Sequence, residues 1–327
     1  MTKRIKLNRK PSGKDYFGST GYRIKLFRHL GVYPRGTFCT EAGLFHADDE
    51  LVFAVTNGDT WSAIPGADSY SEADWLHPQL VRLLGSLMFT EQFPEGLRCW
   101  FYPSANGDFL IDELVLDLAS PRTAQLAKEA LLRTVENRLW PEHTRSAWAT
   151  YLNKDYHLFE SAELSLDLLQ DYCAQIGTSN FVLMRGIQAL VKSDMLAMHA
   201  EFLEEATIAT YIALDASFEL VTRHLRAKGV RNPNARDAGL WLYETFDKPV
   251  GVHGAMDMKY YEEFYSQRIR TIHPGSRLGD SPVAPVSASD RKHLRQALPS
   301  VFAFLALGIH PSHVQERIAQ HRPRSDA

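Results

Sequence analysis

The sequence contains few cysteines, and they lie far apart. Its 327 residues include 3 cysteines, Cys39, Cys99 and Cys173. An odd number of widely spaced cysteines without a CxxC pair argues against a disulfide framework and against a structural zinc site. The 13 histidines are also scattered, and no HExxH motif or histidine–carboxylate cluster has the spacing of metal ligands. We therefore expect reduced thiols, no bound metal and no other cofactor.

Long hydrophobic runs are missing as well. No apolar stretch approaches the roughly 20 residues that a membrane-spanning helix needs, and the N-terminus lacks the apolar segment of a secretory signal. With 45% hydrophobic and 23% charged residues, the composition is that of an ordinary globular protein, long enough for two domains. We expect a cytoplasmic protein without a membrane partner.

Acidic residues are almost absent from the beginning of the chain, although the formal net charge of the whole is -3. Within the first thirty residues Asp15 is the only acid, and residues 1–35 are therefore expected to form a basic N-terminal arm. Such an arm either contacts a polyanion or is a solvated, partly disordered segment. Its basic residues are Lys3, Arg4, Lys6, Arg9, Lys10, Lys14, Arg23, Lys25 and Arg28.

Residues 36–150 have the pattern of a mixed α/β domain of unknown role. Short apolar or alternating segments bounded by Gly, Asn, Asp and Pro predict strands, and a leucine-rich stripe predicts a helix over residues 75–92. Asn106-Gly107-Asp108 is a strong turn signal, which predicts a hairpin between the last two strands. The expected strands are residues 51–56, 97–102 and 109–116.

From about residue 120 onward the pattern is helical. The complete fold class is therefore α+β, with a helical domain over residues 151–310, its core at 180–310, and a loose tail at 311–327. The expected helices are residues 123–140, 158–176, 180–198, 199–228, 235–246, 256–273 and a last one ending at Gly308.

The predicted helix over residues 256–273 ends with an arginine and a histidine. Its core stripe contains Tyr261 and Tyr265, and four residues separate Arg268 from His273. Arginine supplies a permanent planar cation suited to phosphate, and histidine exchanges protons near neutral pH. Together these two side chains suit phosphodiester cleavage without a metal.

The order of these helices resembles a known superfamily. A long core helix with Glu205-Ala206 and Phe218-Glu219-Leu220 is followed by a short helix, by Phe264-Tyr265-Ser266-Gln267-Arg268 through His273-Pro274-Gly275, and by a closing helix. This order resembles the Apea-like branch of the HEPN (higher eukaryotes and prokaryotes nucleotide-binding) superfamily. The resemblance covers about residues 180 to 310 and leaves residues 1–150 outside.

The resemblance implies an all-α bundle that dimerises and joins arginine and histidine of two protomers in a metal-independent endoribonuclease site. Many such proteins act in prokaryotic defence or toxin systems. Others have lost catalysis and act as RNA-binding or scaffolding modules. Carried over by position, Arg268 and His273 are the catalytic pair. The sequence departs from the family pattern at Ile269, where a small polar residue is usual, and at Pro274, where Gly is common.

Helical geometry restricts how this pair can work. Five positions along an α-helix place Arg268 and His273 roughly 140° apart around the axis, so one regular helix cannot form the site. Pro274 disfavours the α conformation at His273, so the last turn can unwind. Alternatively, a two-fold dimer places each histidine beside the partner's arginine.

Four further residues are candidates for a supporting role. The Tyr265 hydroxyl can reach the site from the helix core, and Arg270 and Arg277 can add phosphate contacts that are not base-specific. Glu219 is either a partner of the catalytic arginine or an i,i+4 partner of Arg223 on its own helix.

The structural alternative for the pair itself is a role in packing. Arg268 can pair with Glu219 or Asp215, and His273 can complement the helix macrodipole as a C-terminal cation.

Three functions follow from these alternatives. The first is an endoribonuclease that binds RNA and works as a homodimer, with a protein regulator as a possible further partner. The second is a catalytically inactive RNA-binding or scaffolding protein of the same fold. In the third, the N-terminal region carries the main activity or senses a trigger, and the helical region only dimerises.

Overall fold

A computed structural model describes most of the chain. It describes residues 22–57, 76–90, 99–111, 116–137, 156–160, 164–177, 180–252, 260–272 and 288–321. For residues 105–111, 134–137, 267–272, 288 and 313 it describes the backbone alone.

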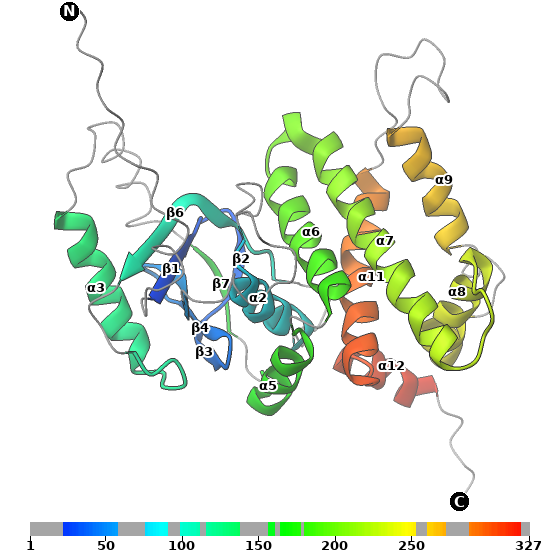
Figure 1. The fold of residues 1–327 in the computed structure, drawn as a ribbon, viewed down its shortest axis with the longest axis horizontal. Coiled ribbons are helices and arrows are strands. Elements are labelled where there is room, and N and C mark those ends of the chain that lie inside the picture. Colours follow the sequence, from blue (N-terminus) through cyan, green and yellow to red (C-terminus); the bar gives the residue numbers. More distant parts are fainter. Residues whose placement is uncertain are drawn as a thin grey trace, which may run out of the picture.

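The N-terminal region folds around an antiparallel sheet of five strands, in the order β3-β4-β5-β1-β6 (Figure 1). A tight turn joins β3 and β4, and Gly43 at its end has φ 155°. A Cβ atom there would lie 2.3 Å from the carbonyl oxygen of Val55, so this close approach of two strands requires glycine. The strands are β1 (Tyr22–Phe27), β3 (Gly36–Thr40), β4 (Gly43–Ala47), β5 (Val52–Asn57) and β6 (Pro103–Ile111).

Strand β1 corrects the expected extent of the basic arm. Residues 22–27 lie between β5 and β6 in the sheet, so the part of the arm from Tyr22 onward belongs to the folded region. Ile24 and Leu26 are fully buried against helix α3 (Thr123–Asn137), and even Lys25 is only 3% exposed. The alternating apolar residues of this segment are buried and make it a strand, although its basic residues are typical of a solvated segment.

The predicted turn at Asn106-Gly107-Asp108 is wrong, because β6 continues through these residues. Its pairing with β1 is irregular at this point: Lys25 is opposite Asp108, whereas Phe27 is opposite Pro103. The extra residues on β6 are accommodated in this bulge, which is a common place for turn-forming residues within a strand.

A second, small sheet links the two halves of the sequence. It consists of β2 (Val32–Pro34) and β7 (His157–Phe159), which pair in parallel. Residues 158 and 159, expected at the start of a helix, therefore lie in a strand, and helix α5 begins only at Leu166. Ser165 caps it by accepting a hydrogen bond from the backbone amide of Leu168.

The helical region is built around α7, as its long apolar stripe predicted. In Figure 1, α6 and α11 lie on one side of α7, and α8 and α9 lie on the other. Its helices are α5 (Leu166–Gln175), α6 (Phe181–Ala197), α7 (Leu203–Ala227), α8 (Ala235–Leu242), α9 (Tyr260–Ile272), α11 (Ala288–Leu307) and α12 (Ser312–His321), with 3₁₀ turns at η3 (Ala200–Phe202) and η5 (Lys248–Val250) and a π-helix, η4 (Tyr243–Asp247).

Helix α12 shows that the expectation of a loose tail over residues 311–327 is wrong from Ser312 to His321. Val314 is buried, and the ring of His321 lies beside Gly251 at the end of η5. The segment is short and polar, and its contact with η5 accompanies its folding into a packed helix.

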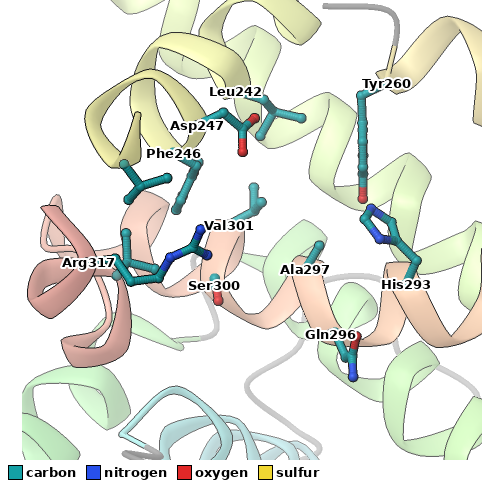
Figure 2. A pocket seen from close by; sticks show the side chains of 12 residues that line it. Leu242, Phe246, Asp247, Tyr260, His293, Gln296, Ala297, Ser300, Val301 and Arg317 are labelled. Atoms are coloured by element: carbon teal, nitrogen blue, oxygen red, sulfur yellow. The ribbon is translucent and has the colours of Figure 1, made fainter. Parts of the chain in front are cut away.

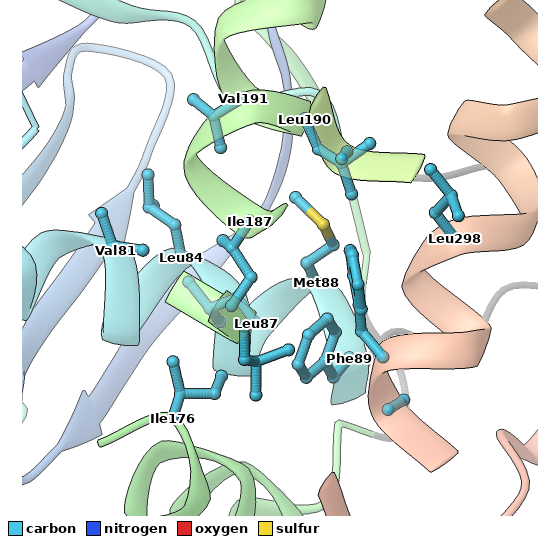
Figure 3. Close-up of a cluster of buried hydrophobic side chains, with 14 of the residues drawn as sticks. Val81, Leu84, Leu87, Met88, Phe89, Ile176, Ile187, Leu190, Val191 and Leu298 are labelled. Atoms are coloured by element: carbon cyan, nitrogen blue, oxygen red, sulfur yellow. The ribbon is translucent and has the colours of Figure 1, made fainter. Parts of the chain in front are cut away.

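One hydrophobic core joins the sheet to the helices. Helix α2 (Pro78–Thr90) belongs to the N-terminal region by sequence, but it packs against α5, α6 and α11 as well as against β4 and β5. Figure 3 shows Leu87 and Met88 of α2 beside Ile187 of α6 and Leu298 of α11. The opposite face of the sheet is covered by α3 (Figure 1).

A buried ion pair lies at the same junction. The Nε atom of Arg295 in α11 lies 2.7 and 2.9 Å from the two carboxylate oxygens of Asp194 in α6. Its Nη2 atom donates both to Asp194, at 2.7 Å, and to the carbonyl oxygen of Cys99, at 2.6 Å. Both charged side chains are 2% exposed, so this pair replaces water by protein partners from three separate segments.

In the described parts of the chain, none of the helices combines the length and the apolar character that crossing a membrane demands.

Candidate functional site

Helix α9, which carries the predicted site, is held by contacts with α7 and α11. Tyr261 is 2% exposed, and its ring centroid lies 5.3 Å from that of Phe218 in α7. The hydroxyl groups of Tyr261 and Ser217 are 3.1 Å apart and hydrogen bond to each other. On the other side, Phe264 stacks on His293 of α11 at 5.9 Å. The first half of α9 is thus fixed in the bundle.

The backbone of Arg268 and Arg270 lies in the last two turns of this helix. Regular α-helix continues to Ile272, the last described residue before His273. His273 and Arg277 lie outside the described residues, and the side chains of Arg268 and Arg270 are not among those described. Figure 1 places this end of α9 beside the beginning of α11, at the same end of the bundle as the connection between α6 and α7.

Tyr265 does not belong to the core, contrary to the prediction. Its side chain is 51% exposed. The buried face of α9 runs through Tyr260, Tyr261 and Phe264 and faces α7 and α11, so position 265 is rotated away from it. The exposed ring is therefore accessible to a molecule that binds along this side of α9.

Glu219 occupies the surface of α7 and has basic partners on its own helix. Its Oε1 atom accepts a hydrogen bond from Nε of Arg223 at 2.8 Å and lies 4.0 Å from Nη1 of Arg226. The predicted i,i+4 pair with Arg223 is confirmed. All three side chains are more than 40% exposed, so the pair contributes only a few tenths of a kcal/mol, about 0.2–0.5.

A pocket at the other end of α9 was not predicted from the sequence. This pocket, of about 290 Å³, lies between the α8–η5 segment, α9, α11 and α12 (Figure 2). Burial raises the pKa of the Tyr260 hydroxyl well above its ordinary value, and the neighbouring Tyr261 and Asp247 add to this effect. The polar residues that line the pocket are Asp247, Tyr260, His293, Gln296, Ser300 and Arg317.

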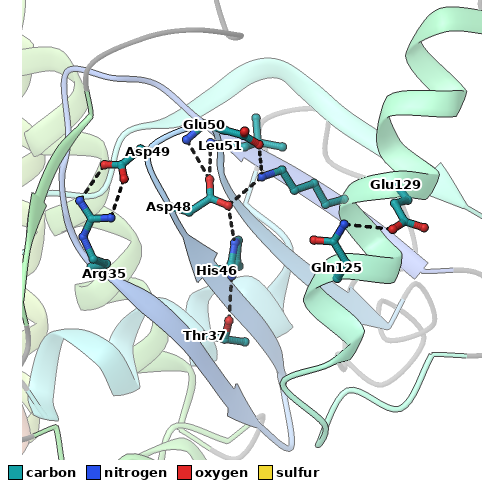
Figure 4. A network of polar contacts seen from close by, with 10 residues as sticks. Arg35, Thr37, His46, Asp48, Asp49, Glu50, Leu51, Gln125 and Glu129 are labelled. Atoms are coloured by element: carbon teal, nitrogen blue, oxygen red, sulfur yellow. Dashed lines mark hydrogen bonds and ion pairs between the residues drawn. The ribbon is translucent and has the colours of Figure 1, made fainter.

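A polar network on the sheet was also missed (Figure 4). The Oγ1 atom of Thr37 is 2.7 Å from Nδ1 of His46, and Nε2 of His46 is 3.0 Å from Asp48. The ammonium group of Lys128 in α3 binds Asp48 at 2.7 Å and Glu50 at 2.5 Å. Burial favours the neutral form of Asp48, but hydrogen bonds from Lys128, His46 and two backbone amides bring the pKa of its carboxyl down to about 2.

The network contains a hydroxyl, an imidazole and a carboxylate in sequence, as in nucleophilic catalysis. Here, however, Thr37 and His46 are direct partners across β3 and β4, and the carboxylate of Asp48 is shared with Lys128. These contacts fix the strand register and attach α3 to the sheet. We therefore assign the network a structural role.

In comparisons with known proteins, no family model, no curated protein and no solved structure matches the chain. The expectation of RNA cleavage therefore rests on the resemblance of the sequence to the HEPN superfamily. Among the described residues, no group of three or more His, Cys, Asp or Glu side chains is arranged to hold a metal ion.

Proposed function

We propose that the chain is a metal-independent endoribonuclease in which Arg268 and His273 act on the scissile phosphate. The supporting observation is helix α9, which is continuous from Tyr260 through Arg268 to Ile272, the residue that precedes His273 in the sequence. The succession of α7, α8, α9 and α11 also agrees with the order of elements on which the family resemblance rests. The chain would then belong to the Apea-like branch of the HEPN superfamily.

In the proposed reaction the 2′-hydroxyl of RNA attacks the adjacent phosphorus and displaces the 5′-oxygen of the next nucleotide. His273 exchanges the protons of these two oxygens, and Arg268 stabilises the charge that develops on the phosphoryl oxygens. Arg270 and Arg277 supply further phosphate contacts, which position the strand without reading its sequence. The need for a 2′-hydroxyl selects RNA over DNA.

The helical course of α9 favours a site made by two chains. The backbone is helical from Arg268 to Ile272, and on a regular helix continued to His273 the two side chains would point in different directions. A two-fold dimer avoids this difficulty, because it brings the histidine of one chain to the arginine of the other. We therefore include a homodimer in the proposal.

Cleavage of mixed single-stranded RNA in EDTA tests the proposal. Arg268→Ala and His273→Ala should each lower the rate by at least about 100-fold, the usual effect of removing a proton-transfer or charge-stabilising group. Arg236→Ala is a matched control, because Arg236 is an exposed arginine on the neighbouring helix α8. Equal rates in the two site variants and the wild type would refute the assignment.

The same experiment distinguishes the second candidate function. A wild-type protein that retains RNA in a filter-binding assay without cutting it would be the catalytically inactive RNA-binding form. The departures at Ile269 and Pro274 from the family pattern are the specific reason to consider this form.

A further inference from the structure

The pocket between α8–η5, α9, α11 and α12 has the composition of a ligand site. Its volume of about 290 Å³ is roughly twice that of a protein cavity that accommodates benzene. Four separate elements form its walls, so the protein must fold completely before the pocket exists. It lies at the opposite end of α9 from Arg268 and does not belong to the proposed cleavage site.

The apolar part of the pocket is partly aromatic. Phe246 is held by edge-to-face contacts with Trp241, at 6.1 Å, and with Phe304, at 5.6 Å. Val301 of α11 lies across from Phe246 in Figure 2. The π-helix η4 lets two successive side chains, Phe246 and Asp247, line the same pocket, and such π-helical turns are frequent at functional sites. This part fits one planar ring.

One end of the pocket carries a cation. Figure 2 shows the guanidinium group of Arg317 directed into the pocket toward Ser300, with Asp247 on the facing wall. Arg317 is exposed at the rim and forms no ion pair with any side chain in the described part of the protein. A guanidinium group in this situation is suited to a carboxylate or a phosphate, whereas Asp247 accepts a hydrogen bond from a hydroxyl or amino group.

The other end carries a buried donor. The Tyr260 hydroxyl is inaccessible to solvent and has no hydrogen-bond partner among the residues that the structure describes. Its ring lies 6.0 Å from that of His293, centroid to centroid. A buried hydroxyl without a partner is unfavourable, so an acceptor that reaches this end with a small shift of His293 would be favoured.

We propose that this pocket binds a small aromatic acid with a hydroxyl or amino substituent. The oxyanion, carboxylate or phosphate, binds Arg317. The ring lies between Phe246 and Val301, and the substituent donates to Asp247 or accepts from Tyr260. The proposal is independent of the RNA-cleaving function, because none of these residues takes part in it.

Calorimetric titration of the full chain with 4-hydroxybenzoate tests the proposal, with phenyl phosphate to separate the two oxyanions and neutral 4-hydroxybenzamide for comparison. The acid or the phosphate ester should bind at least tenfold more tightly than the amide. Arg317→Gln should remove this preference without changing the affinity for the amide. Arg236→Gln, which removes an exposed arginine on α8 outside the pocket, should change neither.

A second variant distinguishes binding inside the pocket from a purely electrostatic attraction of the anion to the rim. Ala297→Trp places an indole in the pocket and should abolish binding of the acid and the amide, with thermal unfolding used to verify that the variant is folded. Equal affinity for acid and amide, an unchanged preference in Arg317→Gln, or binding that survives Ala297→Trp would overturn the proposal. Absence of binding at millimolar concentration would overturn it as well.

Discussion

Individual buried side chains in this protein have properties that their residue type alone does not give. His77, directly before α2, is 3% exposed. Burial, together with the positive charge of Arg23, lowers the pKa of its imidazole from 6.5 to about 3. The folded protein therefore keeps His77 neutral at a pH at which an exposed histidine is already protonated.

This shift makes stability depend on pH. Below pH 6.5 the unfolded chain binds a proton that the folded chain does not, so the free energy of unfolding decreases as the pH falls from 6.5 toward 3. Between pH 7 and pH 5 the loss due to His77 is about 2 kcal/mol. In His77→Gln this contribution should vanish, and urea unfolding at both pH values measures it as a difference between the two proteins. Parallel pH dependences would contradict the buried neutral state.

At the residue scale the sequence predicted only part of the candidate site. It placed Arg268 on a helix and paired Glu219 with Arg223, because both follow from local helical spacing. It misplaced Tyr265, since a stripe pattern cannot tell which neighbouring position turns toward α7. The pocket could not be predicted, because Asp247, Tyr260, His293 and Arg317 come from four elements and share no local motif.

Among the elements, α6 and α11 are joined by a contact that amphipathic patterning does not explain. Asp194 and Arg295 lie on the buried faces of their helices and bind each other and the carbonyl oxygen of Cys99. A charged residue at a core position of a helix was the available signal. The contribution of such a charge to stability depends on its partner, which here lies 101 residues away in the sequence. Local spacing cannot identify a partner at that separation.

Removing one partner of this pair should be far more harmful than removing both. Arg295→Met leaves the carboxylate of Asp194 buried without its counterion and should lower the free energy of unfolding by about 3–5 kcal/mol. The double variant Asp194→Leu/Arg295→Met should recover most of that loss, because no buried charge remains. Urea denaturation of the three proteins gives both values. A double variant as unstable as the single one would show that the pair matters for packing and not for charge.

Other elements were predictable to different degrees. Helices α3, α6, α7 and α11 were foreseen because each has a sustained apolar stripe. Helix α12 and strand β1 were not, since α12 is short and polar and packs on η5, and β1 is short, lies within a basic segment and gains its structure from the neighbouring strands. In β6, a sequence typical of a turn lies in a bulge within the strand, so the strand was not recognised. The errors therefore concern elements whose stability comes from distant contacts.

For the molecule as a whole, the proposed two-chain site predicts complementation. Arg268→Ala and His273→Ala proteins are each inactive in the proposal, but a mixed dimer contains one site with an intact arginine and an intact histidine. Random mixing gives half mixed dimers with one working site of two, so the mixture should reach about a quarter of the wild-type rate.

The RNA cleavage rate of the two variants, measured separately and after mixing with subunit exchange, checks this prediction. A mixture as inactive as its components, in a protein whose wild type cleaves, would place both residues of each site in one chain. Such a result would require an unwound last turn of the helix, which Pro274 favours.

The position of α2 has a consequence for how this protein can be divided. Although α2 precedes residue 150, its side chains fill the space between α5, α6 and α11. A fragment that begins at residue 151 would therefore expose a groove where Leu87 and Met88 had been, and a fragment that ends there would carry an unmatched apolar helix. The sheet and the helices are thus expected to unfold as one cooperative unit. No single position in the sequence separates them, because α2 packs among helices that follow residue 150.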